Sequence, residues 1–144
     1  MRHGKKVKKL NRTSSHRKAL MSNLASSLIV HKQIRTTDAK AKELRRYAER
    51  LVTYAKKDSL HGRRLILKNI KGSNSKEIAN ILMHEIAPVY KDRNGGYTRI
   101  IKLGNRKNDN SLVSMIQFVD FKKTTEAVDS ATSEDNKDDI SSGD

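Results

Sequence analysis

Ten Lys and Arg side chains lie within the first 37 residues of this chain, and the first Asp or Glu is Asp38. Because no carboxylate inside the stretch can neutralise these cations, the compensating anions must come from elsewhere. Phosphate groups are suitable partners, since binding them releases the counterions that a polyanion condenses. The ten side chains are Arg2, Lys5, Lys6, Lys8, Lys9, Arg12, Arg17, Lys18, Lys32 and Arg35.

The first twelve residues carry six of the ten cations and little apolar surface. Val7 and Leu10 are the strongly apolar side chains that follow Met1. Such a segment cannot offset the entropy of ordering its backbone, so we expect a disordered arm that becomes ordered on binding. Fully extended, twelve residues span about 40 Å.

Charge is distributed unevenly along the 144 residues, whose formal net charge is +15. Residues 125–144 hold seven acids and one base, so residues 1–124 carry 30 bases against 9 acids, a net +21. Well-behaved small domains carry net charges of about 2–8 in magnitude, so this surplus favours a polyanionic partner. We expect a single domain over residues 1–123, with its arm at 1–12, and a disordered acidic tail over residues 124–144.

Residue patterns that carry catalysis or bind metal are missing from the sequence. Cys is absent, the five His residues share no ligand spacing, and no Gly-rich nucleotide loop or Ser nucleophile motif occurs. These absences predict a protein that is not an enzyme and uses no cofactor, metal or small-molecule substrate. No apolar run approaches the roughly 20 residues of a membrane span, and the basic N-terminus lacks the apolar core of a signal peptide, so we expect a cytoplasmic protein without a membrane partner.

Apolar periodicity and turn residues divide the chain into helices and strands. Leu20, Leu24 and Leu28 repeat every four residues behind the N-cap candidates Ser14 and Ser15, which indicates a helix with one buried face. The same reasoning predicts helices over about residues 14–31, 38–57, 59–71 and 74–88, and strands over residues 33–36, 97–103 and 112–121.

Two local predictions concern the ends and faces of these elements. Asn74 and Glu77 have the spacing of a capping box at the start of the fourth helix. Strand alternation places Tyr97, Ile101 and Leu103 together on one face of the second strand, and Arg99 shares that face.

The order helix, strand, three helices, two strands predicts an α+β domain built in two layers. We expect the three strands to form one small mixed sheet, in which the last two strands make a hairpin with a long basic tip at residues 104–110. Helices can then cover one face of the sheet. The other face is free to carry polar and basic side chains toward a partner.

The residues favour one of three classes of function. Phosphate-dominated binding to a folded RNA or to duplex DNA is favoured, because six aromatic residues are too few for a platform that stacks single-stranded bases. No zinc-finger or RNA-recognition-motif signature occurs. A DNA-packaging protein is the alternative to a structural RNA-binding protein, although the hairpin tip offers no apolar wedge residue. An RNA-modifying enzyme would need a cofactor loop or catalytic pair that the sequence lacks.

Several blocks of sequence resemble one known family. MRHG at the start and LNRTSSHR at residues 10–17 resemble the N-terminus of the bacterial large-ribosomal-subunit protein seventeen family, and TTDAKAKELRR at residues 36–46 resembles its second helix. RNGGYTRI at residues 93–100 and LGNR at residues 103–106 resemble its hairpin. The similarity covers about residues 1–121, with the blocks in the family's order.

This resemblance implies a two-layer α/β fold with the element order given above, in a structural, non-enzymatic component of the large ribosomal subunit. It also implies contacts with ribosomal RNA near the outer side of the peptide exit tunnel, and with neighbouring large-subunit proteins. Gly95 and Gly96 are better explained by the backbone freedom of a turn, and Tyr97 either stacks on a base or packs in the hairpin. From the family positions and the neighbouring basic residues, we expect the RNA contacts to be Arg2, His3, Lys5, Lys6, Lys8, Lys9, Arg12, His16, Arg17, Lys18, Arg35, Lys40, Arg45, Arg46, Arg93, Tyr97, Arg99, Arg106 and Lys107.

Overall fold

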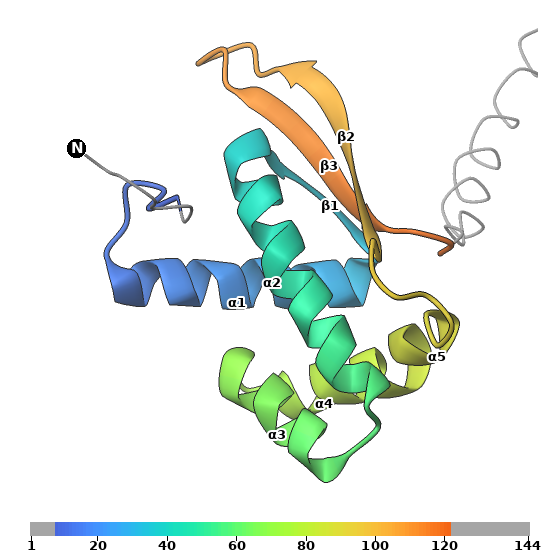
Figure 1. Ribbon diagram of the computed structural model, residues 1–144. Coiled ribbons are helices and arrows are strands. Elements are labelled where there is room, and N and C mark those ends of the chain that lie inside the picture. Colours follow the sequence, from blue (N-terminus) through green and yellow to red (C-terminus); the bar gives the residue numbers. More distant parts are fainter. Residues whose placement is uncertain (1–7, 122–144) are drawn as a thin grey trace, which may run out of the picture.

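The structure is a computed structural model that describes residues 8–121 (Figure 1). Its elements in chain order are α1 (Ser14–His31), β1 (Gln33–Thr37), α2 (Asp38–Lys56), α3 (Leu60–Asn69), α4 (Ser75–Ile81), the π-helix η1 (Leu82–Ile86), α5 (Ala87–Val89), β2 (Thr98–Asn105) and β3 (Leu112–Phe118). Since α4, η1 and α5 follow one another without a break, the predicted α+β class and element order are confirmed. Residues 1–7 of the predicted arm and the predicted acidic tail over residues 124–144 lie outside the described residues.

Helix α2 is the central element of the fold. Its buried face consists of short and branched apolar side chains at helical spacing, which lets the sheet and the other helices approach it closely. Figure 1 shows α2 lying along the sheet near its N-terminal end and reaching α3 at its other end, with α1 crossing it. The short helices α3, α4 and α5 gather at the end of the molecule away from the hairpin tip (Figure 1).

The sheet has the strand order β1-β3-β2, and both neighbouring pairs are antiparallel. The expected mixed sheet is therefore wrong. A mixed sheet would need β1 to pair with β2, which runs in the same direction. Strand β3 lies between them instead, because the hairpin brings it back beside β1.

One face of the sheet forms the core with the helices. The strand register places Ile34, Ile116 and Ile100 in one row across the sheet. Ile116, at the centre of the row, is fully buried, and its two neighbours pack against the same apolar cluster as α2. This arrangement confirms the expected two layers.

The predicted grouping of Tyr97 with Ile101 and Leu103 on one face of β2 is wrong. Ile101 and Leu103 are 37% and 44% exposed, whereas Thr98 is buried. Strand β2 begins at Thr98, and the ring of Tyr97 is buried before the strand starts, by packing against Tyr90. Alternation counted from Thr98 turns Ile101 away from the helices.

Two helix ends also differ from the prediction. Thr13, rather than Ser14 or Ser15, is the N-cap residue of α1, and its side chain makes no capping hydrogen bond. Asn74 is the N-cap residue of α4, but its side chain makes no capping hydrogen bond either, so the predicted capping box is wrong. A side-chain cap requires an extended backbone at the N-cap residue, and the backbone of Asn74 is not extended. Its Oδ1 instead accepts a hydrogen bond from the Ser73 hydroxyl.

Candidate nucleic-acid interface

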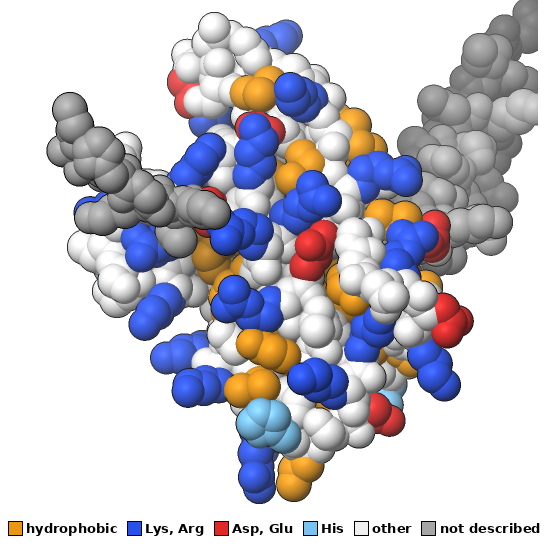
Figure 2. Space-filling view, viewed as in Figure 1, with side chains coloured by type: hydrophobic (Ala, Val, Ile, Leu, Met, Phe, Trp, Pro, Cys, Tyr) orange, Lys and Arg blue, Asp and Glu red, His pale blue; other side chains and the backbone are white. Residues whose placement is uncertain are grey.

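Positive charge exceeds negative charge throughout the described part of the chain. Residues 8–121 carry 25 Lys and Arg against 9 Asp and Glu, and five ion pairs within this range leave 20 of the 25 cations without a carboxylate partner there. Figure 2 shows Lys and Arg side chains spread over the face that carries α1 and α2, with few carboxylates between them. The folded domain, and not only its arm, therefore presents uncompensated cations.

The first turn of α1 brings three predicted contacts together. His16 and Lys18 are exposed, Arg17 is half-buried, and the turn contains no acid. Cations at a helix N-terminus oppose the helix dipole by roughly 0.3–1 kcal/mol each. A phosphate group at this end would interact favourably with both the dipole and the cations.

Residues 8–12 of the arm turn back toward α2. The Arg12 N–H donates to the Lys9 carbonyl at 3.1 Å, and Leu10 has a φ of 54°. The Lys8 N–H donates a long hydrogen bond of 3.4 Å to Oε1 of Glu43 on α2. The three basic side chains of this segment are exposed.

A cavity of about 240 Å³ opens between the arm, α1 and α2. Three of the predicted contacts, Arg17, Lys18 and Arg46, come from two different helices and line it together. Arg50 also lines the cavity, and the predicted set missed it. The complete lining consists of Leu10, Arg17, Lys18, Met21, Glu43, Arg46, Tyr47 and Arg50.

The signal for Arg50 was present in the sequence. Glu43, Arg46, Tyr47 and Arg50 are spaced at i, i+3, i+4 and i+7, so they share one face of α2. That face contains both an aromatic ring and two guanidinium groups.

The remaining predicted contacts on α2 are less free. Lys40 is half-buried, and Arg45 donates through Nε to Glu49 at 3.4 Å. Lys42, which is not one of the predicted contacts, pairs with Asp38 at 2.7 Å, and the hydrogen bond from its ammonium group lowers the pKa of the Asp38 carboxyl.

The open face of the sheet carries two predicted contacts. Arg35 lies opposite Met115 in the register, and Arg99 lies opposite Gln117. Both arginines are exposed. Because these rows alternate with the row of core-facing isoleucines, the two guanidinium groups rise from the face away from the helices.

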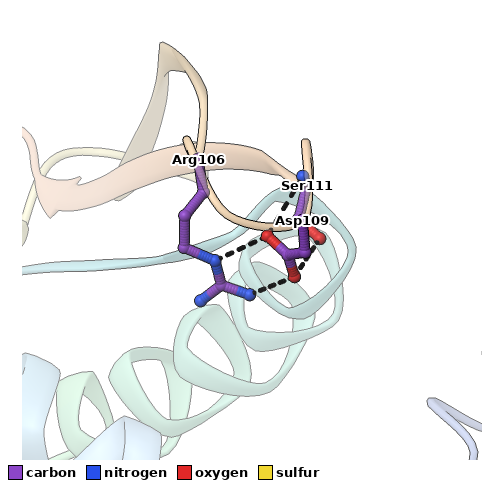
Figure 3. Close-up of polar contacts among 3 residues, drawn as sticks. All are labelled: Arg106, Asp109 and Ser111. Carbon is purple, nitrogen blue, oxygen red and sulfur yellow. Dashed lines mark hydrogen bonds and ion pairs between the residues drawn. The ribbon is translucent and has the colours of Figure 1, made fainter.

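The hairpin tip is held by a polar network (Figure 3). Nε and Nη2 of Arg106 donate to the two carboxylate oxygens of Asp109 at 2.8 and 2.6 Å, and the Ser111 hydroxyl donates to Oδ2 at 2.8 Å. These hydrogen bonds hold the pKa of Asp109 well below its usual range. Arg106 is therefore partly neutralised, while the exposed Lys107 has no ion pair among residues 8–121.

Arg93 is exposed but has an acidic partner, whereas Tyr97 is buried. Nη2 of Arg93 donates to Asp120 at 2.9 Å, and its guanidinium group lies 5.9 Å from the ring centre of Tyr90. Tyr97 is 3% exposed, and its ring centre lies 5.1 Å from that of Tyr90. Of the two alternatives for Tyr97, the structure shows packing, so we remove Tyr97 from the proposed RNA contacts.

Among residues 8–121, no group of three or more His, Asp or Glu side chains is placed to hold a metal ion. None of the helices in that range is long and apolar enough to cross a membrane. Arg2, His3, Lys5 and Lys6 of the predicted contacts lie outside the described residues.

A small α+β domain with this much uncompensated positive charge belongs to the class of basic proteins suited to binding a polyanion. Comparison with known proteins gives the family: residues 20–119 match the family described as Ribosomal protein L17, and the chain belongs to it. The resemblance drawn from the sequence blocks is thereby confirmed.

Relatives called large ribosomal subunit protein bL17 are similar over most of the chain. The protein of Amoebophilus asiaticus is 53% identical over 121 residues, which are 84% of this chain and 61% of that protein. This chain therefore spans less than two thirds of the length of that relative. The Flavobacterium johnsoniae protein is 49% identical over 84% of this chain and 72% of its own length. The Rhodopseudomonas palustris (strain TIE-1) protein is 48% identical over 94% of this chain and 96% of its own length.

Proposed function

We propose that this chain, a structural protein of the large ribosomal subunit, binds ribosomal RNA near the outer side of the peptide exit tunnel. The family and the names of its relatives support the subunit. The observation that supports RNA as the ligand is the set of 20 described cations without a carboxylate partner. The function involves no catalysis, takes place on cytoplasmic ribosomes, and includes neighbouring large-subunit proteins as further partners.

The distribution of the free cations suggests how the protein acts. Arg17 and Arg46 lie at the α1–α2 cavity, Arg35 and Arg99 on the open sheet face, and Lys107 at the hairpin tip. These surfaces belong to different elements of one folded domain. The protein can therefore neutralise phosphates of separate RNA segments and hold together strands that would otherwise repel one another.

Sedimentation separates a ribosomal role from general polyanion binding. The tagged full-length protein should remain with large subunits through a high-salt wash and in the presence of excess duplex DNA. Release from the subunits onto the DNA would overturn the proposal in favour of DNA packaging.

Directed cleavage tests the location. The sequence contains no Cys, so single-cysteine variants can carry an iron chelate that generates hydroxyl radicals at one known place. We expect Asn108→Cys at the exposed hairpin tip to cut large-subunit RNA, and Ser73→Cys in the exposed turn between α3 and α4 to give a different and weaker pattern. Cleavage far from the RNA around the tunnel exit by both variants would overturn the location.

A further inference from the structure

The cavity between the arm, α1 and α2 combines an apolar floor with a cationic rim. Met21 is only 7% exposed, and it lines the cavity with Leu10 and Tyr47. The Tyr47 hydroxyl donates to the Asn69 carbonyl at 2.7 Å, which fixes the ring from its far end. The folded domain therefore supplies part of the apolar floor through Met21 and the anchored ring of Tyr47, and Leu10 completes the floor from the arm.

The rim carries more positive than negative charge. Arg17, Lys18, Arg46 and Arg50 line the cavity against one acid, Glu43. None of these four cations has an ion pair among residues 8–121. An occupant that satisfies the site must offer an apolar body and at least one anionic group.

We infer that this cavity receives a single unstacked RNA base, with guanine preferred, while the rim cations hold the phosphates on either side of it. This inference rests on the RNA binding proposed above. A base offers a flat apolar body between two phosphates, and unstacked bases of folded RNA are commonly held by aromatic and Arg side chains. The volume of about 240 Å³ is below the roughly 300–1,000 Å³ of sites for larger small molecules, so it fits one heterocycle.

The preference for guanine comes from Glu43. A carboxylate only accepts hydrogen bonds, and guanine presents two adjacent donors, N1–H and N2–H, on its Watson–Crick edge. Uracil presents one donor between two carbonyl oxygens, which a carboxylate repels. The Lys8 N–H donates only one long hydrogen bond of 3.4 Å to Oε1 of Glu43, so Oε2 and the second lone pair of Oε1 can both accept from the two donors of guanine.

A variant that fills the cavity without changing charge tests this inference. Leu10 lines the cavity from the half-exposed arm and is not part of the buried core, so Leu10→Trp can place an indole ring in the cavity while the fold is kept. Asn11→Trp is the matched control, because Asn11 is the next residue, is exposed, also has a positive φ and does not line the cavity. Full-length wild type and both variants are titrated with large-subunit RNA. Bound guanines are then probed with kethoxal, which modifies exposed Watson–Crick edges of guanine.

We expect Leu10→Trp to bind about tenfold more weakly, in line with the loss of one stacked base, and Asn11→Trp to bind like wild type. One guanine should be protected by wild type and by Asn11→Trp, and left reactive by Leu10→Trp. Changing that guanine to uracil in the RNA should weaken the wild type about tenfold and leave Leu10→Trp unaffected.

Other outcomes overturn the inference in distinguishable ways. Equal affinity and equal protection for wild type and Leu10→Trp would exclude a base in the cavity, yet leave RNA binding intact. Equal losses in both Trp variants would assign the effect to the bulk of the arm. A cavity that captures an acidic peptide in place of RNA would identify a protein partner. Failure of the wild type to bind the RNA would refute the proposed function and this inference together.

Discussion

Ion pairing within the fold divides the basic residues into two groups that should contribute differently to RNA binding. Arg17 and Arg46 line the cavity and have no ion pair among residues 8–121. Arg45 forms an ion pair with Glu49 at 3.4 Å, and Arg93 forms one with Asp120 at 2.9 Å. The test compares two double variants. One combines Arg17→Gln and Arg46→Gln, and the control combines Arg45→Gln and Arg93→Gln. Both remove two positive charges.

The expected magnitude follows from counterion release. Each phosphate contact contributes about 0.7 for single-stranded and about 0.9 for duplex nucleic acid to the slope of log K against log salt concentration. Loss of two contacts should therefore reduce that slope by about 1.4–1.8. A paired arginine must exchange a carboxylate for a phosphate, so the control should reduce the slope by no more than about 0.7–0.9, the value of one contact.

The assay is a filter-binding or anisotropy titration of large-subunit RNA between about 50 and 200 mM salt, a range over which proteins with several phosphate contacts lose orders of magnitude in affinity. Thermal unfolding of both double variants checks that the fold is kept. If the two double variants change the slope equally, net charge alone governs binding, and the assignment of contacts from the ion pairs is refuted.

The remaining predictions concern the fold and the termini. Gly62→Ala should destabilise the protein by about 1–3 kcal/mol in urea unfolding, because the new Cβ would lie 2.5 Å from the Tyr54 carbonyl oxygen; an unchanged midpoint would contradict this close packing. Folding lowers the pKa of Asp38 below its ordinary value of 3.8. The ionised carboxylate therefore stabilises the fold at pH values above 3.8, and this stabilisation is lost as the pH falls through the pKa of the folded state. Asp38→Asn should lose less stability than wild type between about pH 5 and pH 2.5 in urea unfolding. Deletion of residues 1–12 should weaken RNA binding and flatten its salt dependence, and an unchanged slope would exclude a role for the arm. Removal of residues 125–144 should leave the unfolding midpoint and subunit assembly unchanged, and lost assembly would show that this segment is required.

Sequence patterns predicted the long helices well, because helical periodicity and end signals agree there. The predicted spans 14–31 and 38–57 match α1 and α2 closely. The start at Ser59 is correct as well, since its hydroxyl accepts the Gly62 N–H at 3.0 Å and caps α3. Gly95, with a φ of 152°, occupies the turn that its backbone freedom predicted.

The errors arose where long-range contacts decide the structure. The sheet was expected to be mixed because the sequence does not reveal which strand lies at the centre, and the central strand decides whether neighbouring strands are parallel or antiparallel. Tyr97 was counted in the alternation of β2, although its ring packs against that of Tyr90, which follows α5. The ion pair of Arg93 with Asp120 spans 27 residues, so spacing could not reveal it. The pair of Arg106 with Asp109 spans three residues and could have been predicted.

The basic run on α2 shows what the fold adds to composition. Arg45 and Arg46 are neighbours in sequence, but successive residues of a helix point about 100° apart. Arg45 therefore meets Glu49 one turn along, while Arg46 lines the cavity with Tyr47 and Arg50. One run of cations thus produces both a neutralised helix surface and a charged rim around an apolar floor. For this reason, the positions of cations relative to acids and rings, and not their number, should determine which nucleotides the protein contacts.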